Sequence, residues 1–306
     1  MKRILFVAMA SALLVGCKTS KTVESNDGEN AFWQTMLLQQ TESNIEWGII
    51  TAKYENGTTL YFRITDNFGN VALTWDRSLK NYDEGESSYK GNFEVPSFVF
   101  SGENREFMFR VTEIDENAFY GCKDITSMTI PFSVMRIGNN AFRGCTSLQK
   151  FNINEYNTMY KDIDGVLFSK DSKMLIQYPA KKKQTEYMIS EDVVAISPSA
   201  FRDCSNLEIV SIGDGVAVIS DFAFRNCQNL KELILGKSLR ITGKEAFFEC
   251  PKLAVIHSRN TFPPHNSPVV YEKATKDNCK LYVPQSRLEE YKKHLEWNEF
   301  KNIAGE

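Results

Sequence analysis

Apolar residues recur along this chain at a fixed interval. The pentapeptides AFYGC, AFRGC, AFRDC, AFRNC and AFFEC end at Cys122, Cys145, Cys204, Cys227 and Cys250, so one constant step separates them except for a longer interval after Cys145. Ahead of each lies an apolar pair spaced V-x-x-I, and behind each lies an apolar triple spaced L-x-x-V-x-I. The fifth copy departs from the pattern, with Leu239 and Thr242 in place of the apolar pair, and with Ser258 as the third residue of its triple. The chain from Val111 onwards is therefore built from similar units of about 23 residues.

The spacing within one unit predicts how it folds. One unit cannot bury its own apolar side, so units stack as coils and share a continuous core. The last two apolar residues of the triple are two apart, as on one face of a β-strand. The Ala-Phe-x-x-Cys stretch is short, and we expect it to form a helical turn on the opposite side of the coil. The sequence therefore predicts a β-rich solenoid of the α+β class.

The repeated residues are similar to those of a known family. The pattern V-x-x-I-x-x-x-A-F-x-x-C-x-x-L resembles the signature of the BspA-like leucine-rich repeats, found in surface lipoproteins of anaerobic bacteria. Its period lies within the span of roughly 20–29 residues that is typical of leucine-rich repeats. The resemblance runs from about Val111 to the C-terminus. It implies a leucine-rich repeat stack, and adhesion to host matrix proteins or other cells.

The long interval between Cys145 and Cys204 predicts an insert over positions 155–192. Within it, GVLF and MLIQY flank the polar stretch SKDSK, a pattern typical of a β-hairpin, which the family resemblance also implies. The segment DIDGVLF also resembles the first motif of the haloacid-dehalogenase phosphatases, in which Asp162 would be the nucleophile. That motif needs a buried strand before the first Asp, whereas NTMYK precedes Asp162 here. We therefore predict that the protein is not an enzyme, and that Asp164 and Gly165 form a turn.

The two flanks of the repeats have their own patterns. Residues 46–110 alternate between apolar and polar positions with breaks at Gly, which predicts a β-rich N-terminal cap or small domain. Residues 111–268 contain the repeats. Residues 269–306 predict a C-terminal cap made of a strand, a short helix and an aromatic closure. We also expect a short helix over residues 32–40. Caps are needed because the end of a solenoid is an exposed edge.

The N-terminal residues predict an anchor in a membrane. MKRILFVAMASALLVGC begins with basic residues, continues with an apolar run and ends in small residues, as in a secretory signal peptide of residues 1–16. The sequence LVGC resembles the lipobox of bacterial lipoproteins, which implies cleavage before Cys17 and its acylation. Residues 17–45 begin as a polar, flexible tether. By resemblance to lipoprotein sorting, the lack of Asp after Cys17 implies the outer membrane.

The orientation of this lipoprotein stays open between two alternatives. In some bacteria, surface export uses an acidic stretch directly behind the lipidated cysteine, and here the first acidic residue is Glu24. One hypothesis is a lipid-anchored binding protein on the cell surface. The alternative is a periplasm-facing structural or assembly lipoprotein without a host ligand.

Composition excludes several other functions. A formal net charge of −3 provides no basic surface for nucleic acid. Five of the seven cysteines occupy the same repeat position, so they point side by side and we favour buried free thiols over disulfides. The sequence has no C-x-x-C motif and only three histidines, so we predict no metal site and no cofactor.

The outward positions of the L-x-x-V-x-I strands form the candidate binding surface. They lie between the inward apolar residues and make two rows of mixed, partly apolar character, which suits recognition of a protein or glycan by shape. The first row consists of Ser127, Lys150, Ile209, Glu232 and Val255. The second row consists of Thr129, Asn152, Ser211, Ile234 and His257.

Overall fold

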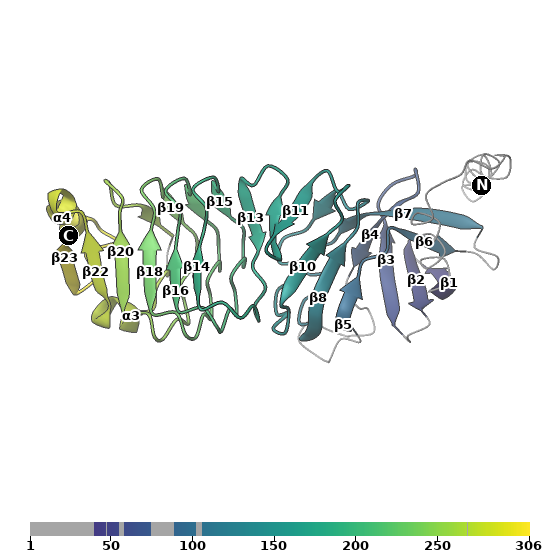
Figure 1. Ribbon diagram of the computed structural model, residues 1–306, viewed down its shortest axis with the longest axis horizontal. Helices are drawn as coiled ribbons and strands as arrows, with labels where there is room; N and C mark the ends of the chain where they lie inside the picture. Colours follow the sequence, from purple (N-terminus) through teal and green to yellow (C-terminus); the bar gives the residue numbers. More distant parts are fainter. Residues whose placement is uncertain (1–39, 47, 55–57, 75–88, 102–105, 268) are drawn as a thin grey trace.

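A computed structural model describes residues 40–46, 48–54, 58–74, 89–101, 106–267 and 269–306. The molecule is an elongated stack of coils, with the N-terminal strands at one end and a small helical cap at the other (Figure 1). The predicted signal peptide, Cys17, most of the tether and all but the last residue of the helix expected over residues 32–40 lie outside the described residues. Among the helices that are described, none is both long and apolar enough to span a bilayer.

The N-terminal region is a β-rich cap, which begins with a strand at Gln40 and so includes the end of the tether predicted for residues 17–45. Four antiparallel strands form a meander, and the fourth of them pairs in parallel with the strand that opens the repeats. These strands are β1 (Gln40–Glu46), β2 (Ile49–Tyr54), β3 (Thr59–Ile64), β4 (Asn70–Thr74) and β7 (Phe107–Ile114), with β6 (Phe98–Ser101) pairing on the other edge of β7. The sheet shares one hydrophobic core with the first coils, so the cap closes the end of the solenoid.

The V-x-x-I pairs and the L-x-x-V-x-I triples form two separate sets of parallel strands. The short strands at the V-x-x-I positions are β9 (Arg136–Ile137), β15 (Ala195–Ile196), β17 (Val218–Ile219) and β19 (Ile241–Thr242), and β21 (His265–Asn266) pairs with β19 beyond the last of them. The L-x-x-V-x-I strands are β8 (Asp124–Ile130), β10 (Lys150–Ile153), β16 (Ile209–Ser211), β18 (Glu232–Leu235) and β20 (Val255–Ser258). Strands of neighbouring coils pair with one another at equivalent positions, which confirms the predicted solenoid.

The Ala-Phe-x-x-Cys stretch is not the helical turn expected from the sequence. It is a run of tight turns with positive φ at the residue before the Ala and at the residue before the Cys, such as Ser199 at 58° and Asp203 at 63°. Backbone N–H groups in this run donate to the next coil, for example from Phe201 to the Ala223 carbonyl at 2.7 Å. A helix would use those groups internally, so stacking of the coils favours the turn conformation instead.

Two ladders of side chains fill the core beneath these turns. The rings of Tyr178, Phe201, Phe224, Phe247 and Tyr271 stack from coil to coil, with centroids 4.5 to 5.3 Å apart. The six cysteines in the described part of the chain are buried free thiols, and five of them form the second ladder.

The thiols also have a regular partner. The Cys227 Sγ donates to the carbonyl of Phe201, the aromatic residue of the preceding coil, at 3.2 Å. Cys145 and Cys250 make the same contact with the aromatic residue of the coil before their own. Each of these thiols is therefore a small core group that joins two coils, and not one half of a disulfide.

The insert is shorter than the predicted residues 155–192. A hairpin is present, formed by β12 (Val166–Ser169) and β13 (Met174–Gln177), and preceded by β11 (Tyr160–Ile163). However, β13 also pairs in parallel with β15 of the repeat, and β14 (Glu186–Met188) pairs with β16.

Residues 174–190 therefore form a coil of their own, here called the degenerate coil. Tyr178 donates its N–H to the Ala200 carbonyl, as Phe201 does to Ala223 one coil later. The long interval between Cys145 and Cys204 thus contains one additional coil as well as the hairpin. The Ala-Phe-x-x-Cys motif does not reveal the degenerate coil, because Tyr178 replaces Phe and Lys181 replaces Cys.

The C-terminal cap is a strand and a helix, as predicted, with additional elements. Its elements are α3 (Lys273–Asn278), β22 (Lys280–Val283), the 3-10 turn η1 (Gln285–Arg287), α4 (Leu288–Lys293) and β23 (Asn302–Gly305). Trp297 and Phe300 are buried against the end of the ring ladder, and the Trp297 indole N–H donates to the Pro264 carbonyl at 2.7 Å. The aromatic closure therefore covers the last coil.

Candidate binding surface and lysine cleft

Strand pairing aligns the predicted surface residues into the two rows. Lys150 lies opposite Ser127, and Asn152 lies opposite Thr129. Farther along, Glu232 lies between Ile209 and Val255, and Ile234 lies between Ser211 and His257. The rows are divided, however, because β8 and β10 belong to a three-stranded sheet, and β16, β18 and β20 belong to a six-stranded sheet. The hairpin lies beside β10 at the division.

The predicted residues differ in how much of their side chain is available. Lys150 is exposed, whereas Ser127 is only 5% exposed and its Oγ donates to the Asn92 Oδ1 at 2.8 Å. His257 stacks on Tyr282 and bonds through Nδ1 to the Glu306 carboxylate at 2.8 Å. The other seven residues are half-buried. Ser127 therefore contributes to the surface mainly by positioning Asn92.

The structure extends both rows with residues that the sequence prediction missed. Strand β5 (Lys90–Glu94) adds Asn92 beside Ser127, and β14 adds Met188 beside Ser211. The Met188 side chain is 77% exposed. Tyr187 lies one repeat period before the inward Val210, and this correspondence would have placed Met188 on the surface.

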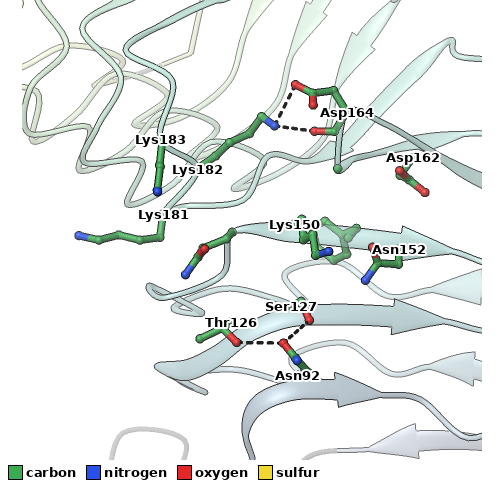
Figure 2. A pocket seen from close by; sticks show the side chains of 13 residues that line it. Asn92, Thr126, Ser127, Lys150, Asn152, Asp162, Asp164, Lys181, Lys182 and Lys183 are labelled. Carbon is green, nitrogen blue, oxygen red and sulfur yellow. Dashed lines mark hydrogen bonds and ion pairs between the residues drawn. The ribbon is translucent and has the colours of Figure 1, made fainter.

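A cleft of about 540 Å³ lies where the two sheets separate. We name it the lysine cleft, after the four lysines in its lining: Lys150, Lys181, Lys182 and Lys183. Polar side chains of β5, β8 and β10 form one wall, and the loop that carries the consecutive lysines forms another (Figure 2). Three of the predicted surface residues, Ser127, Lys150 and Asn152, line it.

The cleft exists because the degenerate coil lacks two apolar side chains. Lys181 occupies the position of Cys204, and Gln184 occupies the position of Leu207, each one period earlier. Both are exposed, whereas the cysteine and leucine of the next coil are buried. Placing a charged group or a side-chain amide at an apolar core position costs free energy, so this loop lies at the surface and leaves the cleft between itself and β10.

Two aspartates fix the hairpin against the cleft. The Asp162 carboxylate accepts the backbone N–H of Ile153 at 2.9 Å. Asp164 pairs with the largely buried Lys182 ammonium at 2.9 Å, and its own carbonyl accepts from the same group at 2.5 Å. Asp164 and Gly165 both have positive φ, 51° and 74°, as expected for the predicted turn.

The repeat units match a known family. Residues 94–180 and 177–267 match the BspA type leucine-rich repeat region, in six copies. The matched segments span more than half of the chain. The chain belongs to the BspA-type leucine-rich repeat family.

Comparison with solved structures finds several similar proteins, and a TM-score above one half with the first of those described below shows a shared fold. A leucine-rich repeat protein from Eubacterium ventriosum is 18% identical, with a TM-score of 0.54 over 80% of this chain and 78% of that one. The pneumococcal vaccine antigen PcpA is 18% identical, with a TM-score of 0.42 over 87% and 100% of the two chains. A leucine rich cell surface protein from Faecalibacterium prausnitzii is 16% identical, with a TM-score of 0.38 over 87% and 95%. No curated protein matches the chain.

Neither the family nor the structure around Asp162 supports the phosphatase interpretation of DIDGVLF. Proteins built from leucine-rich repeats are generally binding proteins and not enzymes. Asp162 lies on β11, which pairs antiparallel with β12, whereas the phosphatase motif places its nucleophile at the end of a parallel strand. Across the described ranges, no group of three or more His, Cys, Asp or Glu side chains has metal-binding geometry.

Proposed function

We propose that this protein is a lipid-anchored binding protein of the cell envelope that recognises a protein or glycan with its repeat sheets. The observation that carries the proposal is the alignment of exposed and half-buried side chains into two rows on stacked parallel strands. An open sheet of this kind offers a broad surface with its backbone hydrogen bonds already made. Specificity then depends on side chains.

The anchoring part of the proposal is supported by the signal peptide and the lipobox-like LVGC ending at Cys17. Acylation of a cysteine adds about 0.8 kcal/mol of membrane affinity for each buried CH₂ group, and several chains give a firm anchor. By resemblance to BspA-like proteins, the ligand would be a host matrix protein or a component of another cell. Adhesion is therefore the role that we propose.

Surface exposure is the first test of this function. Intact cells and lysed cells would be treated with protease and labelled with antibody, with Cys17→Ala as the control. An outward-facing anchored protein is labelled on intact cells, and the label is lost from the membrane fraction in the control. Labelling only after lysis would overturn adhesion and support the periplasm-facing structural role.

Substitution on the sheet tests where the ligand binds. Ile209 and Ile234 lie on the adjacent strands β16 and β18, in different rows. Changing both to Lys introduces two charges into a partly apolar surface, and we expect binding to a protein ligand found in a screen of extracellular-matrix proteins to be lost. Unchanged affinity in this variant would exclude the six-stranded sheet as the site.

A further inference from the structure

The lysine cleft concentrates positive charge in an acidic protein. Its lining contains four lysines and two aspartates, a local difference of +2, whereas the chain as a whole carries a formal net charge of −3. Charges of one sign that line a cleft focus the electrostatic field and raise the local concentration of ions of opposite sign. The cleft is therefore suited to an anionic ligand.

Three of the four lysines are available to such a ligand. Lys182 is paired with Asp164, and Figure 2 shows its ammonium pointing at that residue. Lys150, Lys181 and Lys183 make no ion pair within the part of the chain that the structure describes. Lys150 projects from β10, whereas the other two belong to the loop across the cleft, so the free charges lie on two walls.

The remaining lining favours a ligand rich in hydroxyl groups. Between the lysines lie three side-chain amides, those of Asn92, Gln149 and Asn152, and the hydroxyl of Thr126. Amides donate and accept hydrogen bonds, as sugar hydroxyls do. Phe151 is the only aromatic or aliphatic side chain in this lining, and it is buried. An apolar side chain of a peptide would therefore contact only the methylene groups of polar residues, and no exposed aromatic or aliphatic residue.

A peptide cannot bind here as an additional strand either. Strand addition needs free N–H and C=O groups along a sheet edge. On β10, which is the edge of its sheet, the outward N–H groups of Phe151 and Ile153 already donate to the Gly165 carbonyl and the Asp162 carboxylate, each at 2.9 Å. The hairpin thus blocks the edge and leaves only side chains for recognition.

We propose that the lysine cleft binds an acidic oligosaccharide. Lys150, Lys181 and Lys183 contact its sulfate or carboxylate groups, and the side chains of Asn92, Gln149 and Asn152 bond to its hydroxyls. This inference rests on the proposed binding function and assigns a ligand class to one part of the repeat surface.

The test is calorimetric titration of the purified protein with three sugars of equal length. A chondroitin 4-sulfate hexasaccharide carries sulfates and carboxylates, unsulfated chondroitin hexasaccharide carries carboxylates only, and chitohexaose is neutral. Hexaglutamate represents an acidic peptide. The test variant replaces Lys150, Lys181 and Lys183 with Gln. The matched control replaces three exposed lysines outside the cleft, Lys252, Lys273 and Lys292, and so removes the same charge.

We expect at least one acidic hexasaccharide to bind, with affinity that falls as salt increases. The test variant weakens that binding about tenfold, since three exposed charge pairs are lost, and the control variant changes it less than twofold. If both acidic sugars bind, carboxylate groups are sufficient for recognition by the cleft. If only the sulfated sugar binds, the cleft recognises sulfate groups. Thermal unfolding of both variants checks that they are folded.

Three results would overturn the proposal. They are the absence of binding to both acidic sugars, equal affinity for chitohexaose, and unchanged affinity in the test variant. Tighter binding of hexaglutamate would assign the cleft to an acidic peptide instead. None of these results affects the proposed function, which is tested separately by surface exposure and by substitution of Ile209 and Ile234.

Discussion

Replacing Phe224 with Ala tests whether the ring ladder holds the coils together. Phe224 is completely buried and stacks between Phe201 and Phe247, with centroids at 4.5 and 5.1 Å. Burying a Phe side chain contributes about 1.5–3 kcal/mol, and each aromatic pair adds about 0.5–1.5 kcal/mol. The backbone bonds from Phe224 to Ala246 and from Phe201 to Ala223 restrict collapse of the cavity.

We therefore expect a loss of about 3–5 kcal/mol in the free energy of unfolding, the range typical of Phe→Ala in cores. The total stability of a domain is about 5–15 kcal/mol. Each coil contacts only its neighbours, so this change weakens two interfaces at once. Phe224→Leu leaves a smaller cavity and should cost about 1.5 kcal/mol or less.

The assay is urea unfolding followed by circular dichroism, with Phe68→Ala as the control. Phe68 is 83% exposed, and its truncation should change stability by less than about 0.5 kcal/mol. A decrease in the slope of the transition would show that the solenoid unfolds in two parts. A loss below about 1.5 kcal/mol in Phe224→Ala, or a loss equal to that of the control, would refute the role of the ladder.

Four further predictions concern the thiols and the hairpin. Burial raises the pKa of the Cys145, Cys204 and Cys227 thiols, and that of Cys279 to about 12. These thiols should not react with Ellman's reagent until guanidinium unfolds the chain, and reaction of the native protein would contradict this. The thiols of the unfolded chain lose their protons at lower pH than the buried thiols do, so the protonated thiols contribute fully to stability below about pH 8.5. Above that pH the free energy of unfolding should fall by about 1.4 kcal/mol per pH unit for each thiol. Unfolding midpoints measured between pH 7 and 10 test whether stability falls as pH rises. Gly165→Ala should destabilise the protein by more than the roughly 1–2 kcal/mol that a left-handed Ala costs, because the new Cβ would lie 2.9 Å from the Lys150 Cβ. Gly121→Ala is the control, since Gly121 has a φ of 71° and open space around it and so measures the backbone cost alone. Equal losses of stability in urea unfolding would contradict the prediction. Asp162→Asn keeps an acceptor for Ile153 and should be nearly neutral in stability, whereas Asp162→Ala should cost about 1 kcal/mol; turnover of p-nitrophenyl phosphate by the wild type that Asp162→Asn abolishes would instead restore the phosphatase interpretation.

The conformation of the turns could be predicted in part from the local sequence. The residue before each cysteine is Gly121, Gly144, Asp203, Asn226 or Glu249, and all five have positive φ. Gly, Asp and Asn are the residues that adopt this conformation most readily, so the first four could have indicated a left-handed turn in place of a helical one. Glu249 shows that stacking can impose the same conformation on a residue without that preference.

The extent of the cleft could not have been predicted from the repeat pattern. Tyr178 and Lys181 break the Ala-Phe-x-x-Cys motif, so that motif does not mark the degenerate coil, which ring stacking and strand pairing reveal. Ser127 has the spacing of an exposed residue but is covered by Asn92, which comes from an earlier strand outside the repeats. Contacts of this kind depend on which strand lies beside which.

The amino-acid pattern was sufficient to identify the family, the period of the repeats and the inward residues of each coil. A repeated apolar spacing of this kind is buried only if successive coils stack in register, so local pattern and global fold agree. Only the tertiary structure shows where the register of the stacked coils is interrupted. At the degenerate coil, polar residues at two core positions move the chain to the surface, and the hairpin separates the two sheets. The lysine cleft is the result, because a loop of lysines distant from Lys150 in the sequence then lies across the gap from it.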